Sequence, residues 1–209
     1  ACARNCTVAR PPRVMFLHGN VAVGYCITDR VKGPAGTSCH KCGRPYVSSR
    51  LLYPVEQKNY TSDPFISREW TGLQSALRNA FVFTIFGYGA PQSDVEAIAL
   101  LKKGWGRAGT RELEQVEMID IKNEDDLRKT WDPFILEHHY DIETSFYDSW
   151  IARHPRRSCD AVWRQIMDLE FLVDNPIPRH LPFSQQLAWF KQLLDAEHNA
   201  AKAKQTTDP

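Results

Sequence analysis

Cys39 and Cys42 are separated by two residues and followed by Gly43. This spacing allows two thiolates of one turn to bind the same tetrahedral zinc ion. Cys26 lies upstream, at a suitable distance for a ligand from a second turn. We therefore expect a structural zinc site that contains Cys26, Cys39 and Cys42.

The fourth zinc ligand has several candidates. Asp29 stands where the partner of Cys26 would fall in a second pair, and His40 lies inside the Cys39 turn. Cys2 or Cys6 would reach the site if the N-terminal segment folded back. Asp29 is the ligand we predict. A loop with unliganded cysteines and a redox pair are the alternatives, although no thioredoxin-like strand and helix flank the cysteines.

His18 is the candidate for acid–base chemistry. It precedes Gly19 in a segment, residues 13–27, whose alternating apolar positions predict a strand, a turn and a second strand. At the end of a strand in an α/β sheet, a side chain projects into the ligand crevice. An imidazole titrates near neutrality and can accept a proton there. The alternative is a histidine with a structural role only.

Gly87, Tyr88 and Gly89 directly follow an apolar run at 81–86. Such a run is typical of a strand buried on both faces in a parallel sheet. Glycines after the strand allow the backbone to approach a ligand closely. A tight strand-to-helix turn without a ligand would have the same pattern.

A helix is predicted directly after this turn. Ser93 and Glu96 have the spacing of a capping box, which predicts a helix from about Asp94 to about Lys103. The free amides at the start of that helix favour an anion. The turn and the helix together therefore indicate a nucleotide-binding loop.

Further elements complete an α/β pattern. Asp63 is the predicted N-cap of a helix that extends to Asn79, and residues 51–55 are a short strand candidate. Residues 113–122 predict another strand, which is followed by the start of another helix. We expect a partial Rossmann-like parallel sheet with right-handed crossovers and an inserted zinc knuckle.

The chain changes character after Trp131, where helices are predicted over 133–153, 158–172 and 184–202. We expect a C-terminal helical appendage. The predicted organisation is an α/β portion at 1–130 with its zinc module at about 24–46, the appendage at 131–200, and a flexible tail at 201–209.

Taken in order, these segments resemble the second half of a sirtuin-like NAD-binding domain, over about residues 13–125. The resemblance rests on Leu17-His18-Gly19-Asn20, the cysteine module after it, a strand, a helix, and the apolar strand that ends in Gly87-Tyr88-Gly89. It is closest to divergent bacterial members, many of which consume NAD in antiviral defence.

The resemblance implies NAD and zinc as cofactors and assigns roles to single residues. His18 would be the catalytic base. Gly87, Tyr88, Gly89 and Ser93 would face the nucleotide. Either Asp120 or Asn123, at the end of the next strand, would bind a ribose hydroxyl.

The chain also departs from the sirtuin-like pattern. Sirtuin-like domains have a Gly-Ala-Gly phosphate loop and an Asn and Asp pair ahead of the His-Gly, and residues 1–17 contain neither. We therefore expect a fragment that lacks the N-terminal half of the site. An NAD glycohydrolase or ADP-ribosyl transferase is the main hypothesis. A non-catalytic nucleotide sensor or interaction module, and a zinc-stabilised scaffold, are the alternatives.

Composition limits the partners. The net charge is +1 and basic residues are interleaved with acidic ones, which gives no strong signal for nucleic acid. No apolar run has the length of a membrane span, and no signal peptide is recognisable. We expect a soluble, cytoplasmic protein that binds NAD or ADP-ribose and forms homo-oligomers through the helical appendage.

Overall fold

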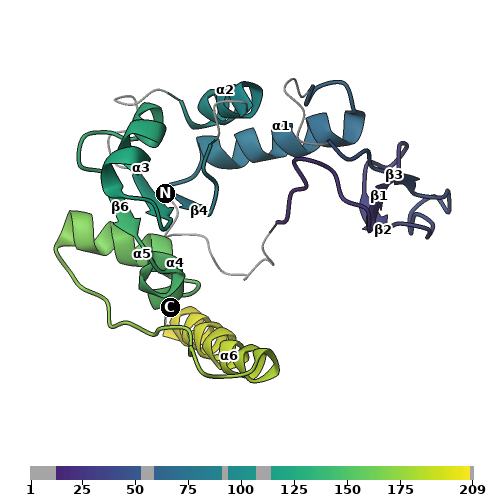
Figure 1. Cartoon of the computed structure of the whole chain (residues 1–209). Helices are drawn as coiled ribbons and strands as arrows, with labels where there is room; N and C mark the ends of the chain where they lie inside the picture. The colour runs from purple at the N-terminus through teal and green to yellow at the C-terminus, as the bar shows by residue number, and fades with distance from the viewer. Residues whose placement is uncertain (1–12, 53–58, 91–93, 107–113, 208–209) are drawn as a thin grey trace. The chain divides into compact units, whose positions relative to one another are not determined.

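The computed structural model describes residues 13–52, 59–90, 94–106 and 114–207. The fold is mixed α/β (Figure 1). Its contacts divide the chain into two units. The first contains Val14–Met118 and Lys122–Ile142, and the second is formed mainly by Glu143–Pro209.

A small antiparallel sheet begins the first unit. Its strands are β1 (Val23–Tyr25), β2 (Lys32–Pro34) and β3 (Val47–Ser48), in the order β2-β1-β3. Gly24 and Gly33 are paired across β1 and β2, and the Tyr46 side chain packs over both. A Cβ on Gly33 would lie 2.2 Å from the Tyr46 ring. These glycines therefore provide the space that Tyr46 occupies.

The strand predicted at the start of the 13–27 segment is wrong. Residues 13–17 have no partner strand among the described residues, and Val14 is exposed. Their backbone instead bonds to side chains of a helix: Phe16 N–H donates to Glu69, and the Trp70 indole donates to the Leu17 carbonyl. Alternating apolar residues predict an extended segment, but they do not indicate whether its backbone bonds to a neighbouring strand or to helix side chains.

Helix α1 (Pro64–Arg78) confirms the predicted N-cap. The Asp63 carboxylate accepts hydrogen bonds from the amides of Phe65 and Ile66. Of the 51–55 strand candidate, Leu51 and Leu52 are irregular, and residues 53–55 lie outside the described part of the chain.

A second, parallel sheet contains β4 (Val82–Phe86), β5 (Gln115–Ile119) and β6 (Tyr140–Glu143), in that order. Val116 N–H donates to the His139 carbonyl, and Asp120 N–H donates to the Glu143 carbonyl, so β5 and β6 run parallel. Strand β5 is buried throughout. Strand β4 lies at an edge of this sheet as described, and Phe86 is 65% exposed. The prediction of a β4 buried on both faces is therefore wrong.

Helices α2 (Val95–Trp105) and α3 (Glu124–Trp131) connect these strands. Helix α2 packs closely on α1 at Gly104, where a Cβ would lie 2.8 Å from the Cα of Gln74. The Gln74 amide also donates to the Leu100 carbonyl. The aromatic residues Phe83, Trp105 and Trp131 meet in the core beneath the sheet, at ring separations of 5.2 to 6.4 Å.

The second unit is helical. Its helices before residue 183 are shorter than predicted, whereas its last helix is longer than the predicted 184–202 and continues to Thr207, into the predicted flexible tail. It contains the turn Phe146–Asp148, α4 (Trp150–Arg153), α5 (Ser158–Trp163), a π-helical turn (Arg164–Asp168) and α6 (Phe183–Thr207). The predicted helix at 133–153 is wrong, because it includes β6. The helix predicted to 172 ends at Asp168, where Leu169 is left-handed with φ 52°.

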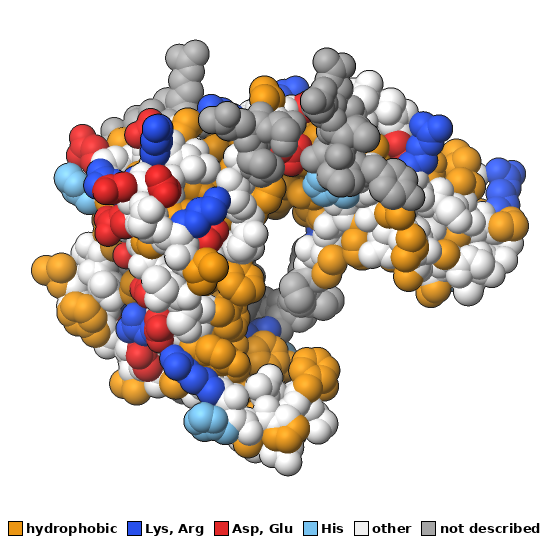
Figure 2. All heavy atoms as spheres, in the orientation of Figure 1, with side chains coloured by type: hydrophobic (Ala, Val, Ile, Leu, Met, Phe, Trp, Pro, Cys, Tyr) orange, Lys and Arg blue, Asp and Glu red, His pale blue; other side chains and the backbone are white. Residues whose placement is uncertain are grey.

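Hydrophobic side chains remain on the surface of the second unit (Figure 2): Leu169 and Phe171 in the irregular segment before α6, and Phe183 at its start, are each at least 74% exposed. Among the described residues, no helix is both long and apolar enough to cross a membrane.

Candidate functional site

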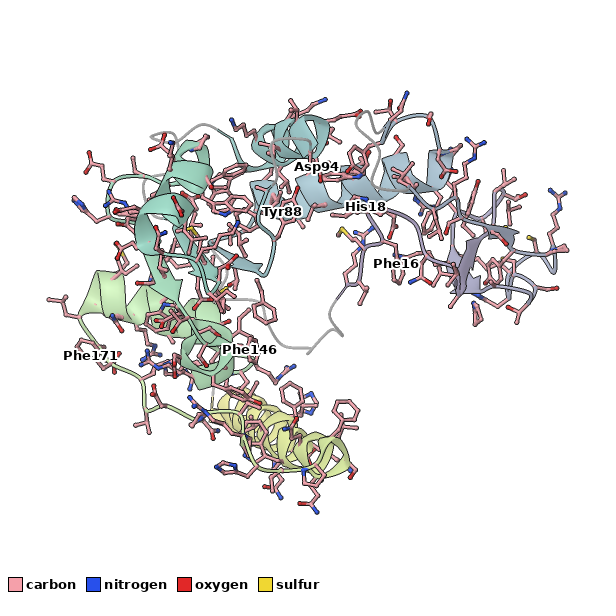
Figure 3. All side chains as sticks on the ribbon, in the orientation of Figure 1. Phe16, His18, Tyr88, Asp94, Phe146 and Phe171 are labelled. Atoms are coloured by element: carbon pink, nitrogen blue, oxygen red, sulfur yellow. The ribbon has the colours of Figure 1, made fainter. Side chains whose placement is uncertain are left out.

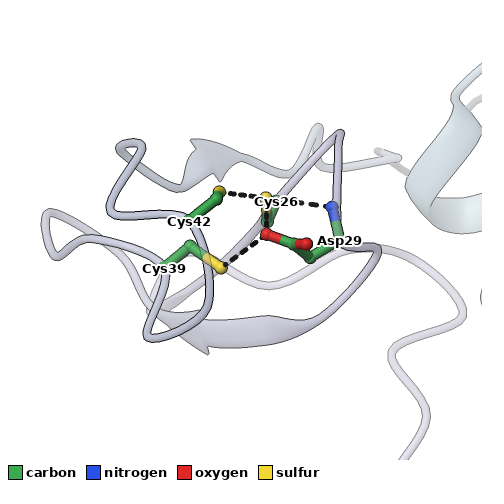
Figure 4. A group of neighbouring side chains, drawn as sticks. All are labelled: Cys26, Asp29, Cys39 and Cys42. Atoms are coloured by element: carbon green, nitrogen blue, oxygen red, sulfur yellow. Dashed lines mark hydrogen bonds between the residues drawn. The ribbon is translucent and has the colours of Figure 1, made fainter.

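Cys26, Asp29, Cys39 and Cys42 form a cluster in which one ligand atom of each lies within 4.8 Å of the others (Figure 4). Tetrahedral ligands held about 2.3 Å from one zinc ion lie about 3.8 Å apart, so atoms this close together need only small shifts to bind one ion. The cluster is therefore a candidate metal site, and it contains all four residues predicted as ligands.

Two turns bring these side chains together. Arg30 N–H donates to the Cys26 carbonyl, and the Asp29 amide donates to Cys26 Sγ. In the second turn, Gly43 N–H donates to the Cys39 carbonyl at 2.8 Å. Gly43 has φ 71°, a conformation that glycine adopts without strain. Each turn thus presents two ligand atoms to the same point.

Hydrogen bonds within the cluster shift the pKa values of its groups in opposite directions. Asp29 Oδ2 lies 3.4 Å from Cys26 Sγ and 3.3 Å from Cys39 Sγ. Hydrogen bonds from Cys42 and Cys39 lower the pKa of Asp29, whereas the Asp29 carboxylate raises the pKa of the Cys42 thiol. A divalent cation would favour the deprotonated form of all four groups, because its positive charge attracts the negative thiolates and carboxylate.

The other candidate ligands are not part of this cluster. His40 Nδ1 lies 3.4 Å from the Tyr46 hydroxyl, next to the small sheet. Cys2 and Cys6 lie outside the described residues.

The glycine turn after β4 has open space on one side. Gly87 has φ 65°, and no described residue lies within 4 Å of the place that a Cβ would occupy. At Gly89, a Cβ would lie 2.9 Å from the amine of Lys122, which follows β5. The turn therefore leaves its backbone accessible and has a cation beside it.

A buried carboxylate joins this turn to the His18 segment (Figure 3). Asp94, the N-cap of α2, is 4% exposed and accepts from the Tyr60 hydroxyl at 2.8 Å and from the Tyr88 hydroxyl at 3.0 Å. The Tyr60 ring lies edge-on to the His18 ring, with centroids 5.4 Å apart. The structure thus links His18 to Tyr88 through three contacts.

His18 itself is exposed, and its position is set by its backbone. Its carbonyl accepts from Leu52 N–H at 2.9 Å. Gly19 has φ 84°, and a Cβ there would overlap the Arg50 carbonyl. The glycine after His18 is therefore required by the close approach of the Arg50–Leu52 backbone.

The remaining predicted site residues have different placements. Asn123 caps α3: its side chain accepts from Asp126 N–H at 2.9 Å and donates to the Asp126 carboxylate at 2.7 Å. Asp120 directly follows β5. Ser93 lies outside the described residues, and Asp94 holds the N-cap position instead.

Tyr60 and Asp94 were not among the predicted site residues. Asp94 had one usable signal, its position at the predicted start of α2. Tyr60 had none, because its partners His18 and Asp94 are far from it in the sequence.

Comparison of the chain with protein-family models, with curated proteins and with solved structures finds no match.

Proposed function

We propose that the chain is a zinc-stabilised, sirtuin-like protein that binds NAD at the glycine turn after β4 and contributes to cleavage of the nicotinamide–ribose bond. The observation that carries the proposal is the contact path from His18 through Tyr60 and Asp94 to Tyr88. It brings together the residue expected to act as base and the turn expected to hold the nucleotide.

The chain's own residues fit a dinucleotide at this turn. The backbone of Gly87 has open space beside it, and the amine of Lys122 lies next to Gly89. Backbone amides and a lysine are the usual partners of a pyrophosphate. Asp94 would not contact the ligand directly, because two tyrosine hydroxyls already bind its oxygens. Its role would be to hold Tyr88 in place.

His18 has the exposure that a catalytic base requires. An exposed imidazole can accept a proton from a ribose hydroxyl or from water near neutral pH. The edge-on contact with Tyr60 orients the ring, and the Leu52 bond holds its backbone.

Zinc is the metal that the Cys26, Asp29, Cys39 and Cys42 cluster fits best. Three thiolates and a carboxylate give four ligands, as in closed structural sites that have no open position for a substrate. The small sheet β1–β3 has few core residues of its own, namely Cys26, Cys39 and Tyr46. The metal would therefore stabilise this module rather than take part in the reaction.

Incubation of the native full-length protein with NAD, followed by measurement of released nicotinamide, tests the proposal. We expect His18→Ala to abolish release while NAD binding persists in calorimetry. His138→Ala, at an exposed histidine of the same unit, is the matched control and should keep the rate. Release that His18→Ala leaves unchanged would contradict the assignment of the base.

A second candidate function is nucleotide binding without turnover. It is favoured by the burial of Asp94, which is 4% exposed and bonded to Tyr60 and Tyr88, so that this carboxylate holds the tyrosines instead of facing a ligand. Calorimetry with NAD and with ADP-ribose separates the two functions. Binding of both ligands without nicotinamide release supports this second one.

A further inference from the structure

A cavity of about 480 Å³, wide open to solvent, lies between the metal module and the N-terminal half of α1 on the first unit. Cys26, Ile27 and Arg30 of the Cys26–Arg30 turn form one wall, and Arg68 and Thr71 of α1 stand on the other. This volume is within the range of small-molecule sites in proteins. None of the residues expected to bind NAD lines it.

The floor of the cavity is aromatic. The Tyr25 and Phe65 rings are stacked, with centroids 5.2 Å apart and planes 27° apart. Phe65 is buried, and Tyr25 is half-buried. Ile27 at the rim is 68% exposed, which is unusual for an isoleucine that lines a cavity. A planar or apolar ligand body would cover these surfaces.

The rim is cationic. Arg30 and Arg68 come from opposite walls, and in the part of the chain that the structure describes, no hydrogen bond, ion pair or ring contact involves either guanidinium. The nearest carboxylates along the sequence are already bonded: Glu69 accepts from the Lys32 amine and Phe16 N–H, and Asp29 belongs to the metal cluster. Ser67 adds a hydroxyl group to the same lining.

The positions of the lining residues in α1 and in the Cys26–Arg30 turn direct them to the cavity. Pro64, Arg68 and Thr71 recur at the helical period on one face of α1, while Ile66 and Trp70 face the core. Arg30 has φ 54°, a left-handed conformation that costs a non-glycine residue free energy.

We propose that this cavity binds a small organic anion, in which a carboxylate or phosphate group is attached to an aromatic or apolar body. Guanidinium groups bind both oxyanions with paired, charge-assisted hydrogen bonds. Arg30 and Arg68 bind the oxyanion, and Tyr25, Phe65 and Ile27 cover the body. The site is separate from the glycine turn and does not depend on the proposed NAD activity.

Titration of the isotope-labelled chain with phenyl phosphate, benzoate and uncharged benzyl alcohol, followed by amide NMR, tests the proposal. We expect both anions to shift the amides of Ile27, Arg68 and Thr71, and benzyl alcohol to bind much more weakly. The anion with the lower Kd shows whether the site prefers a phosphate or a carboxylate group. Absence of shifts with either anion at millimolar concentration, or equal binding of benzyl alcohol, would overturn the proposal.

Arginine variants distinguish this site from general charge attraction. Arg30→Gln and Arg68→Gln should each weaken anion binding about tenfold, the cost of one charge-assisted contact. Arg78→Gln removes the same charge from the last turn of α1 and should leave binding unchanged. Equal losses in all three variants would show that only net charge matters. The same spectra report whether each variant is folded, and Gly87→Ala should not affect this titration.

Discussion

The amine of Lys32 on β2 lies 2.7 Å from a carboxylate oxygen of Glu69, which is buried in the middle of α1. The same oxygen accepts from Phe16 N–H at 2.9 Å, and the same amine donates to the Val14 carbonyl at 2.8 Å. One ion pair therefore joins three segments: the metal module, the chain that leads to His18, and α1. It also explains a buried glutamate on the core side of the helix.

Glu69→Ala should destabilise the first unit. The substitution leaves Phe16 N–H and the Lys32 amine without their acceptor in a partly buried place, and we expect a loss of about 2 to 3 kcal/mol in the free energy of unfolding. Urea denaturation followed by tryptophan fluorescence measures it. The control Arg179→Gln breaks an exposed ion pair with Asp148 and should cost less than about 1 kcal/mol. Equal losses of unfolding free energy in the two variants would contradict the prediction that the buried Lys32–Glu69 pair stabilises more than an exposed pair.

Zinc binding should depend on Asp29. We expect the purified chain to contain about one equivalent of zinc, and chelation to lower its melting temperature, because ligand binding to the folded state stabilises it. Asp29→Ala should lose most of the metal, whereas Asp29→Cys should retain it, since a thiolate also suits tetrahedral zinc. Elemental analysis and thermal melting measure both. Cys159→Ser, at an exposed cysteine outside the cluster, is the control and should leave zinc unchanged.

Acid should destabilise the second unit through His154. Burial lowers the pKa of this imidazole, which stacks on Trp150 and bonds to Asp174 at 3.0 Å. Below its ordinary pKa of about 6.5, the unfolded chain binds a proton that the folded chain does not. The contribution of His154 to the free energy of unfolding is therefore fully present above about pH 6.5, and it is lost as the pH falls towards the lower pKa of the folded state.

Thermal melting at about pH 7.5, 6.5 and 5.5 measures this dependence on either side of the ordinary histidine pKa. His154→Gln should flatten the change between the last two points, and His138→Gln should not. Asp174 also has a lowered pKa, mainly because of its hydrogen bonds from Arg153, but its contribution is lost only at a lower pH, beneath the ordinary carboxyl range. A slope that survives His154→Gln would assign the effect to other groups.

The parts of the fold that the sequence predicts correctly depend on neighbouring residues. Asp63 and Pro64 mark the start of α1 within one turn, and the two cysteine turns each close over a few residues. The parts it predicts wrongly depend on distant partners. The backbone of Phe16 and Leu17 bonds to α1, more than fifty positions later in the chain. Alternating apolar residues cannot indicate such a partner.

Strand β6 and the site around Asp94 illustrate the same limit. Tyr140 and Ile142 alternate in the pattern of a strand, but four residues are too few for this pattern to distinguish a strand from the helix predicted over 133–153. Tyr60 meets His18 and Asp94 only after α1, α2 and β4 have assembled. The candidate metal ligands were predictable because spacing alone positions them, whereas the tyrosine contacts required the tertiary structure.

Gly87→Ala tests the glycine turn against a matched control elsewhere in the first unit. Gly36, between β2 and the second cysteine turn, also has a positive φ, 79°, and in the described part of the chain neither it nor Gly87 has an atom within 4 Å of its Cβ position. Alanine at either place should therefore cost about 1 kcal/mol of stability through backbone strain alone. Only at Gly87 should the added methyl group also enter the space proposed for the nucleotide. Calorimetry with NAD should show clearly weaker binding for Gly87→Ala and unchanged binding for Gly36→Ala, and equal affinities in both variants would place the nucleotide away from this turn.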